Sequence, residues 1–206
     1  MEYEDVSALA VYEKIREEVQ LIYRSRLQTE ILLSLIESNK TLSKLREITG
    51  STSQAVIPKI RKLESMHLLE RQNHEYQLTP LGKVIASKMA DFSRVLVVIN
   101  RHSYFWTSHY MAGIPATLLN GIGDLFNSEI ISDSNVNIFN VYENYLKIIK
   151  EAGYVYGIAS IISPGHANAI GERIVGGIPV ELIISRSVAL QLKEEPYLSK
   201  INSLIN

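Results

Sequence analysis

The sequence contains no cysteine, which excludes disulfide bonds, thiolate metal sites and a cysteine nucleophile. No apolar run approaches the roughly 18 residues that a membrane span requires. The acidic N-terminus lacks a signal-peptide pattern, and the chain has neither an internal repeat nor a low-complexity segment. We therefore expect a protein of the reducing cytoplasm that makes no contact with membranes.

A strong net charge is also missing, because the formal charge of the 206 residues is −1. The charge is nevertheless unevenly distributed. Residues 24–90 carry eleven Lys and Arg against six Asp and Glu, a net charge of +5, whereas residues 1–23 and 91–206 carry −4 and −2. The positive charge thus gathers in one segment, as contacts with phosphate groups would require.

Within this basic segment, residues 41–66 predict two helices joined by a tight turn. Two apolar stripes at helical spacing lie on either side of Gly50, and the hydroxyl residues at 51–53 can cap the second helix. This is the arrangement of a DNA-binding helix-turn-helix, whose second helix enters the major groove. Pro58 has no N–H to donate, so we expect this helix either to begin late or to be distorted at residues 55–57.

The flanking segments extend the motif to a winged helix at 26–90. A helix is predicted at 26–37, and strands at 68–72 and 75–78 form a hairpin around Asn73 and His74. Thr79 and Pro80 begin a long helix with an expected break near Asp91, and its part within 91–112 links to the rest of the chain. A further helix at 6–23, within an N-terminal segment 1–25, either contacts a partner subunit or covers its own chain.

The remainder, residues 113–206, predicts an α/β domain for sensing or assembly. Short helices are expected at 115–126, 142–152 and 164–175, with strands at 128–132, 154–162 and 179–185 and helical structure from 187 interrupted by Pro196. The last two strands are almost wholly apolar, which is typical of strands buried on both faces of a parallel sheet, joined by a right-handed crossover. The fold class is therefore mixed α and β, a winged helix followed by a small parallel sheet.

Eight side chains of the winged helix are candidates for contact with double-stranded DNA. Gln can pair with adenine and Arg with guanine through two hydrogen bonds, while Lys and Arg bind phosphates without reading sequence. The base-reading candidates are Ser53, Gln54 and Arg61, the phosphate candidates are Lys44, Lys59, Lys62 and Arg71, and His74 on the wing can reach a neighbouring groove. The alternative is that these charges only solvate a winged helix that binds proteins.

Four further side chains are ligand candidates, because open α/β sheets bind ligands at the carboxyl ends of their strands. Ser160, Ser163, His166 and Arg186 fall there and could hold a small anionic metabolite near a helix N-terminus. In the alternative, the serines cap helices and His166 is merely exposed.

No catalytic residue, cofactor or metal site is predicted. Neither Ser160 nor Ser163 lies in a G-x-S-x-G nucleophile elbow. His102 and His109 would lie two helical turns apart, too far to share an ion, and the aromatic residues between them favour a hinge between the domains. We therefore expect a protein that is not an enzyme.

Several stretches resemble archaeal winged-helix regulators of the methanogenesis regulatory protein FilR type. They are STSQAVIPKIRKLESMHLLE, YQLTPLGKVIA, FWTSHYMAGIP and YVYGIASIISPGHANAI followed by GGIPVELIIS, in this order. The first is shared by many repressors, and the others are more specific. The resemblance implies a transcription factor of methanogens with an ArsR-like winged helix and a C-terminal sensing domain.

Two departures from known patterns accompany the resemblance. The family's C-terminal domain continues beyond the point that matches Asn206, so we expect a shortened domain with an open sheet edge. The C-terminal half also looks distantly like half a phospholipase D fold, but Ala167 and Asn168 follow His166 where the His-x-Lys signature would place lysine. Phosphodiester hydrolysis is therefore not expected, and a homodimeric DNA-binding regulator is the leading prediction.

Overall fold

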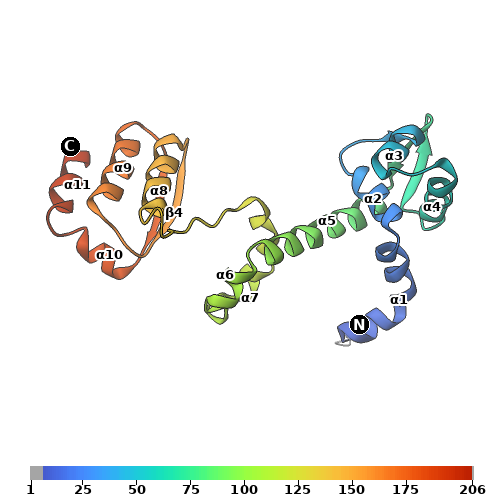
Figure 1. Cartoon of the computed structure of the whole chain (residues 1–206), viewed down its shortest axis with the longest axis horizontal. Coiled ribbons are helices and arrows are strands. Elements are labelled where there is room, and N and C mark those ends of the chain that lie inside the picture. The colour runs from blue at the N-terminus through green and yellow to red at the C-terminus, as the bar shows by residue number, and fades with distance from the viewer. Residues whose placement is uncertain (1–6, 206) are drawn as a thin grey trace, which may run out of the picture. The chain divides into compact units, whose positions relative to one another are not determined.

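The computed structural model describes residues 7–205, so the expected helical residue Val6 lies outside the described residues. The chain divides into two compact units, Met1–Ser128 and Glu129–Asn206, here called the N-terminal and C-terminal units (Figure 1). Each unit is described by itself. Helices, short strands and a parallel strand pair confirm the mixed α and β class.

The N-terminal unit contains a winged helix followed by a long helix. Its elements are α1 Ala8–Arg24, α2 Arg26–Ser34, β1 Lys40–Thr41, α3 Leu42–Thr49, α4 Ser53–Ser65, β2 Leu69–Gln72, β3 Glu75–Leu78, α5 Pro80–Arg101, α6 Ser103–Ser108, η1 Met111–Gly113, α7 Ala116–Leu119 and η2 Ile122–Asn127. The strands form an antiparallel sheet in the order β1-β3-β2. The core between α2, α3, α4 and this sheet includes Ile31, Leu45 and Leu63, none of which is exposed.

The turns of the winged helix follow from local sequence. Gly50 ends α3 in the left-handed conformation, φ 61°, and the amide of Ser51 donates to the carbonyl of Arg46 as in a Schellman motif. Asn73 and His74 both have positive φ, 48° and 66°, which is the requirement of the two-residue turn that joins twisted strands. The predicted helix-turn-helix and hairpin are thus confirmed.

Pro58 does not shorten or distort α4, contrary to our expectation. The helix begins at Ser53, continues through Pro58 to Ser65 and shows no internal departure from helical backbone angles. Pro58 lies on the exposed side of α4, where its ring meets water rather than the core. The burial of Val56, Ile60 and Leu63 holds the helix together across the lost hydrogen bond.

The start of α5 is tied to the winged helix by hydrogen bonds. The hydroxyl of Thr79 accepts from the amide of Gly82 (3.0 Å) and donates to the carbonyl of His67 (2.6 Å), and the Thr79 amide donates to Leu68 (3.1 Å). The predicted cap by Thr79 and Pro80 is confirmed. The break expected near Asp91 is wrong, because α5 is continuous and η2 packs along it there.

Helix α1 extends from the body of the N-terminal unit (Figure 1). Its backbone kinks at Ile15, where φ is −122°. The apolar side chains of Leu9, Tyr12 and Ile15 are between 39% and 65% exposed. The apolar stripe predicted for this helix is therefore not covered by its own chain.

The C-terminal unit contains two parallel strands and their helices. Its elements are α8 Asn140–Glu151, β4 Val155–Ala159, α9 Pro164–Val175, β5 Val180–Ile184, α10 Arg186–Gln191 and α11 Tyr197–Ile205. β4 pairs with β5 in the register Val155 with Val180 to Ala159 with Ile184. A small core of Ile149, Val155 and Ile170 joins α8, β4 and α9.

Two predictions for this unit are wrong. Residues 128–132 form no strand, because the following residues are used to hold α8: the Asp133 carboxylate accepts from the amide of Val141, and the Ser132 carbonyl accepts from the Asn140 side chain. Nor are the strands buried on both faces. Ile158 and Ile183, which pair with each other, are 84% and 70% exposed, because no described element covers their face of the sheet.

Candidate nucleic-acid interface and ligand cavity

The outward surface of α4 is a stripe at helical spacing. Val56, Ile60 and Leu63 anchor the opposite face in the core, which leaves Gln54, Pro58, Arg61 and Ser65, at i, i+4, i+7 and i+11, pointing away from it. We call these four residues the α4 stripe, and all of them are exposed. The two base-reading candidates with long side chains therefore lie on one line.

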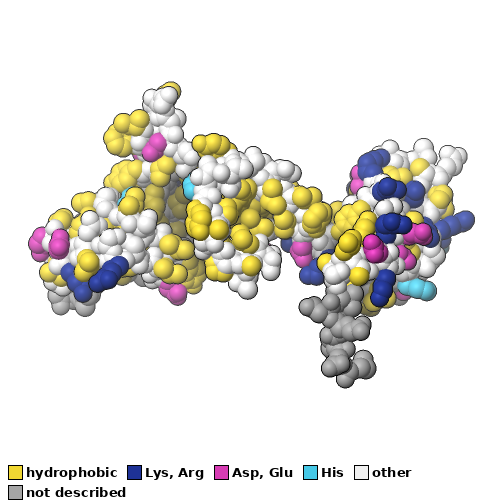
Figure 2. All heavy atoms as spheres, turned by 90° about the horizontal axis from the view of Figure 1, so that it is seen from below, with side chains coloured by type: hydrophobic (Ala, Val, Ile, Leu, Met, Phe, Trp, Pro, Cys, Tyr) yellow, Lys and Arg dark blue, Asp and Glu magenta, His cyan; other side chains and the backbone are white. Residues whose placement is uncertain are grey.

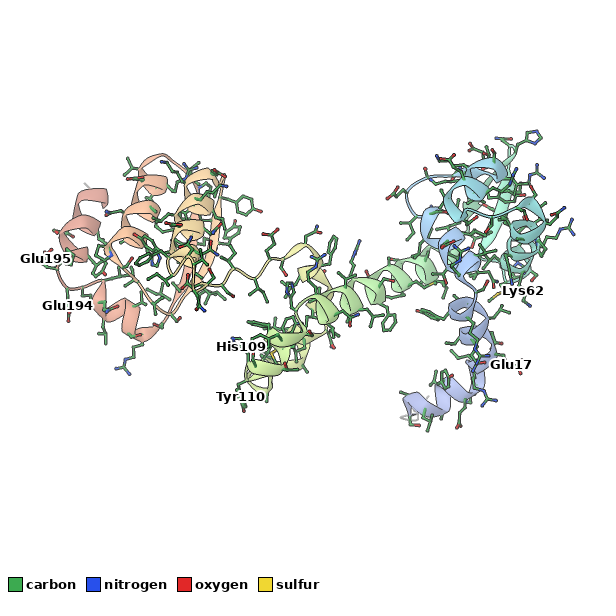
Figure 3. All side chains as sticks on the ribbon, viewed as in Figure 1. Glu17, Lys62, His109, Tyr110, Glu194 and Glu195 are labelled. Atoms are coloured by element: carbon green, nitrogen blue, oxygen red, sulfur yellow. The ribbon has the colours of Figure 1, made fainter. Side chains whose placement is uncertain are left out.

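The polar groups along this surface are free to bind. Within the described chain, the side chains of Gln54, Arg61 and Lys62 make no hydrogen bond or ion pair. Lys62 lies exposed on α4 beside the stripe (Figure 3). A space-filling view shows several Lys and Arg side chains on the visible face of this unit, interspersed with Asp and Glu (Figure 2).

Two predicted DNA contacts on α4 are placed less favourably. Lys59 is half-buried on the side of α4 that faces α1 and α2, where it borders a depression of about 540 Å³ together with Glu17, Arg24 and Gln28. Ser53 is also half-buried at the start of the helix. Sequence reasoning grouped both with the exposed residues because neighbouring positions on a helix differ by 100° and a two-residue shift changes the face.

The remaining basic candidates lie on α3 and the wing. The Lys44 ammonium is 2.6 Å from the Glu47 carboxylate, an exposed pair that phosphate can displace at little cost. Arg71 on β2 lies 3.4 Å from Nδ1 of His74 and 5.7 Å from the ring centre of Tyr76. Arg71 and His74 are both exposed, so the tip of the wing presents two groups that can donate hydrogen bonds to phosphate.

The four ligand candidates of the C-terminal unit do not form one site. The Ser163 hydroxyl caps α9 by accepting from the His166 amide (3.3 Å), and Arg186 is exposed at the start of α10. Only Ser160 and His166 line a cavity of about 380 Å³ at the carboxyl ends of β4 and β5. The predicted position at the strand ends is thus occupied by a cavity, but two of the four side chains lie elsewhere.

Aromatic side chains from α8, which sequence reasoning missed, enclose His166. The ring centres of Tyr142 and Tyr145 lie 5.2 Å and 4.4 Å from that of His166. Burial lowers the pKa of His166 and raises the pKa of the Tyr145 hydroxyl, because both charged forms lose contact with water. Both groups are therefore held in their neutral forms. The spacing of Val141 and Tyr145 on one face of α8 was the available signal.

Neither a metal cluster nor a membrane span emerges from residues 7–205. Across these residues no three side chains of His, Asp or Glu gather as metal ligands do. No helix among them combines the length and apolar character needed to cross a bilayer. His102 is buried with its ring 3.4 Å from the Ser128 hydroxyl, whereas the His109 ring stacks on Phe105 at 4.1 Å. The two histidines thus have separate local partners.

Solved structures with a partial likeness include both regulators and an enzyme. A MarR/EmrR family transcriptional regulator from Acinetobacter sp. ADP1 is 20% identical over 60% of this chain and 92% of its own, with a TM-score of 0.34. The archaeal chromatin protein TrmBL2 is 13% identical over 93% of this chain and 74% of its own, with a TM-score of 0.28. A methyltransferase of calicheamicin biosynthesis is 12% identical, with 95% and 65% covered and a TM-score of 0.28. Likenesses of this size assign neither a ligand nor an activity.

Comparison with family models gives a clearer result. The model of the N-terminal domain of methanogenesis regulatory protein FilR1 matches residues 16–99, and the model of its middle domain matches residues 138–206. No curated protein matches the chain. The two models together cover about three quarters of the sequence, in the order expected from its motifs. The chain therefore belongs to the family of regulatory proteins represented by FilR1.

Proposed function

We propose that this regulator controls transcription by binding double-stranded DNA, with α4 in the major groove. The α4 stripe supports the proposal most directly, because Gln54 and Arg61 are exposed, unpaired and seven residues apart on one line. Side chains so placed reach base edges along a groove. Lys44, Lys62 and Arg71 surround them and supply phosphate contacts. This role agrees with the cytoplasmic location expected from the sequence and with binding rather than catalysis.

Arg61→Ala tests the recognition helix. We expect affinity for a duplex selected from a random-sequence pool to fall at least about tenfold, since a two-bond contact with guanine contributes roughly 1–3 kcal/mol. Fluorescence anisotropy at one fixed salt concentration measures the loss. Lys59→Ala should weaken binding less, because Lys59 is half-buried at the side of α4.

The control is Lys193→Ala, which removes an exposed charge from the C-terminal unit and should leave affinity unchanged. Equal affinity of wild type and Arg61→Ala would show that α4 is not the reading helix. If the wild type retains no duplex even at low salt, the winged helix is instead a protein-interaction module.

We further propose that the regulator acts as a homodimer. Exposed apolar side chains of α5, including Phe92, Leu96 and Ile99, follow one another at i, i+4 and i+7, and α1 adds its uncovered stripe. Figure 2 shows apolar side chains over much of the visible surface of the N-terminal unit away from the winged helix. Burial of such faces against a second copy is favourable. Two copies would present paired α4 helices to a palindromic site.

Leu96→Glu tests the dimer. A carboxylate placed on this face would lose its water on association, so we expect the variant to sediment as a monomer at concentrations where the wild type sediments at twice the chain mass. Val136→Glu, at a side chain that is 97% exposed in the C-terminal unit, is the matched control. A wild type that sediments as a monomer at tens of micromolar would contradict the proposal.

The C-terminal unit, in this proposal, senses a small ligand. A ligand that binds two arrangements of a dimer with different affinity shifts the population toward one of them. If those arrangements differ in the spacing of the paired α4 helices, ligand binding changes the affinity for DNA. Family membership and the cavity beside His166 support this role.

A further inference from the structure

The cavity of the C-terminal unit has the size and enclosure of a small-molecule site. Its volume is about 380 Å³, within the range of roughly 300–1,000 Å³ typical of ligand pockets. Residues from α8, β4, α9, β5, α10 and α11 all contribute to its wall. The site is therefore assembled by the tertiary fold and not by one local turn.

The wall selects against charge. Its polar lining residues are Ser160, His166 and Tyr145, and the other described lining residues are apolar or glycine, with neither Lys, Arg, Asp nor Glu among them. An ionised ligand would lose its water here without gaining an opposite charge, which is costly. The arginine that we expected to hold an anion, Arg186, is not part of this wall.

Two of the polar groups are unused. Within the described chain, neither the Tyr145 hydroxyl nor the ring nitrogens of His166 have a hydrogen-bond partner, although their ring centres are only 4.4 Å apart. A neutral imidazole offers one donor and one acceptor, and a phenol offers both. These groups can together hold a hydroxyl, amide or carbonyl of a ligand whose remaining surface is apolar.

We propose that this cavity binds a neutral, mainly apolar small molecule through apolar contacts with its wall and hydrogen bonds to Tyr145 and His166. The inference rests on the proposed sensing function for its biological purpose, while binding itself is independent of DNA. It names the effector class as uncharged, in place of the anionic metabolite expected from the sequence.

A matched pair of probes tests the inference on the full chain. 2-Naphthol is neutral at pH 7 and 2-naphthoate carries a negative charge on the same ring system. We expect 2-naphthol to shift the methyl NMR signals of Ile170 and Val188 saturably, with those of Leu45 in the N-terminal unit unchanged. 2-Naphthoate should bind at least about tenfold more weakly. Equal or tighter binding of 2-naphthoate overturns the proposal.

Variants place the probe in the cavity. Ala167→Phe, which adds a ring at a lining position of α9, should abolish the 2-naphthol shifts, whereas Val136→Phe adds the same ring at an exposed position and should not. Tyr145→Phe removes only the hydroxyl and should weaken 2-naphthol about 2- to 10-fold while leaving naphthalene unchanged. Tyr145→Phe also decides the question if Ala167→Phe fails to fold. Unchanged 2-naphthol binding in both variants overturns the site.

Failure of this inference can be separated from failure of the proposed function. The same preparation is tested for duplex binding by anisotropy. Duplex binding without 2-naphthol binding overturns the ligand site and leaves the DNA-binding function standing. Binding of 2-naphthol without duplex binding supports the ligand site and contradicts the function.

Discussion

Gly82→Ala is expected to lower the free energy of unfolding of the N-terminal unit by about 3 kcal/mol, the upper part of the range for overpacked sites. A Cβ atom at Gly82 would lie 1.9 Å from the carbonyl oxygen of Leu68 and 2.9 Å from its carbonyl carbon. The obstacle is backbone, and that carbonyl also accepts the hydrogen bond from the amide of Thr79. It cannot move without breaking the joint between β2 and α5.

Hydrogen exchange of the core amides of Leu45 and Leu63 measures this loss in the full chain, since the slowest-exchanging amides report global opening of their unit. Gly113→Ala is the control in the same unit, because the added Cβ meets only the side chain of Tyr110, at 3.4 Å. A Gly82→Ala protein within about 0.5 kcal/mol of wild type, the usual effect of a surface change, would mean that α5 does not approach Leu68 so closely.

Affinity for DNA is expected to fall about a thousandfold when salt rises from 50 to 200 mM. Lys44, Lys62 and Arg71 of two copies supply six phosphate contacts, and each releases roughly 0.9 counterion from duplex DNA. The logarithm of the association constant should then fall against the logarithm of salt concentration with a slope of about −5. Anisotropy titrations at four or more salt concentrations measure the slope.

The charge variants sharpen this measurement. Lys62→Gln removes one contact per copy and should make the slope shallower by about 2, whereas Lys193→Gln in the C-terminal unit should leave it unchanged. A wild-type slope near zero would contradict the phosphate assignments and favour the reading of the winged helix as a protein-binding module.

The winged helix could be predicted because its signals are local. Gly50, the pair Asn73 and His74, and Thr79 each impose a backbone conformation or a cap within a few residues of their own position. The apolar spacing of α4 likewise fixed which face is buried. The orientation of Lys59 could not be predicted, because it depends on where α1 and α2 lie.

The C-terminal unit was predicted less well because its signals are not local. The apolar runs at β4 and β5 gave the strands but not their exposure, which depends on whether another layer covers the face carrying Ile158 and Ile183. The cavity beside His166 also depends on α8, α10 and α11, which come together only in the fold. Strand ends indicated the position of the site, whereas its apolar chemistry required the complete wall.

The close contact of Gly82 with Leu68 has a mechanical consequence for regulation. Because β2 and the first turn of α5 share one carbonyl and have no space between them, a change in the direction of α5 must carry Arg71 and the wing with it. Leu68 also follows directly on the end of α4, through the bond from its amide to the carbonyl of Leu63. Reading helix and wing therefore turn as one rigid body, so a tilt of α5 by a few degrees would alter the fit to both grooves at once.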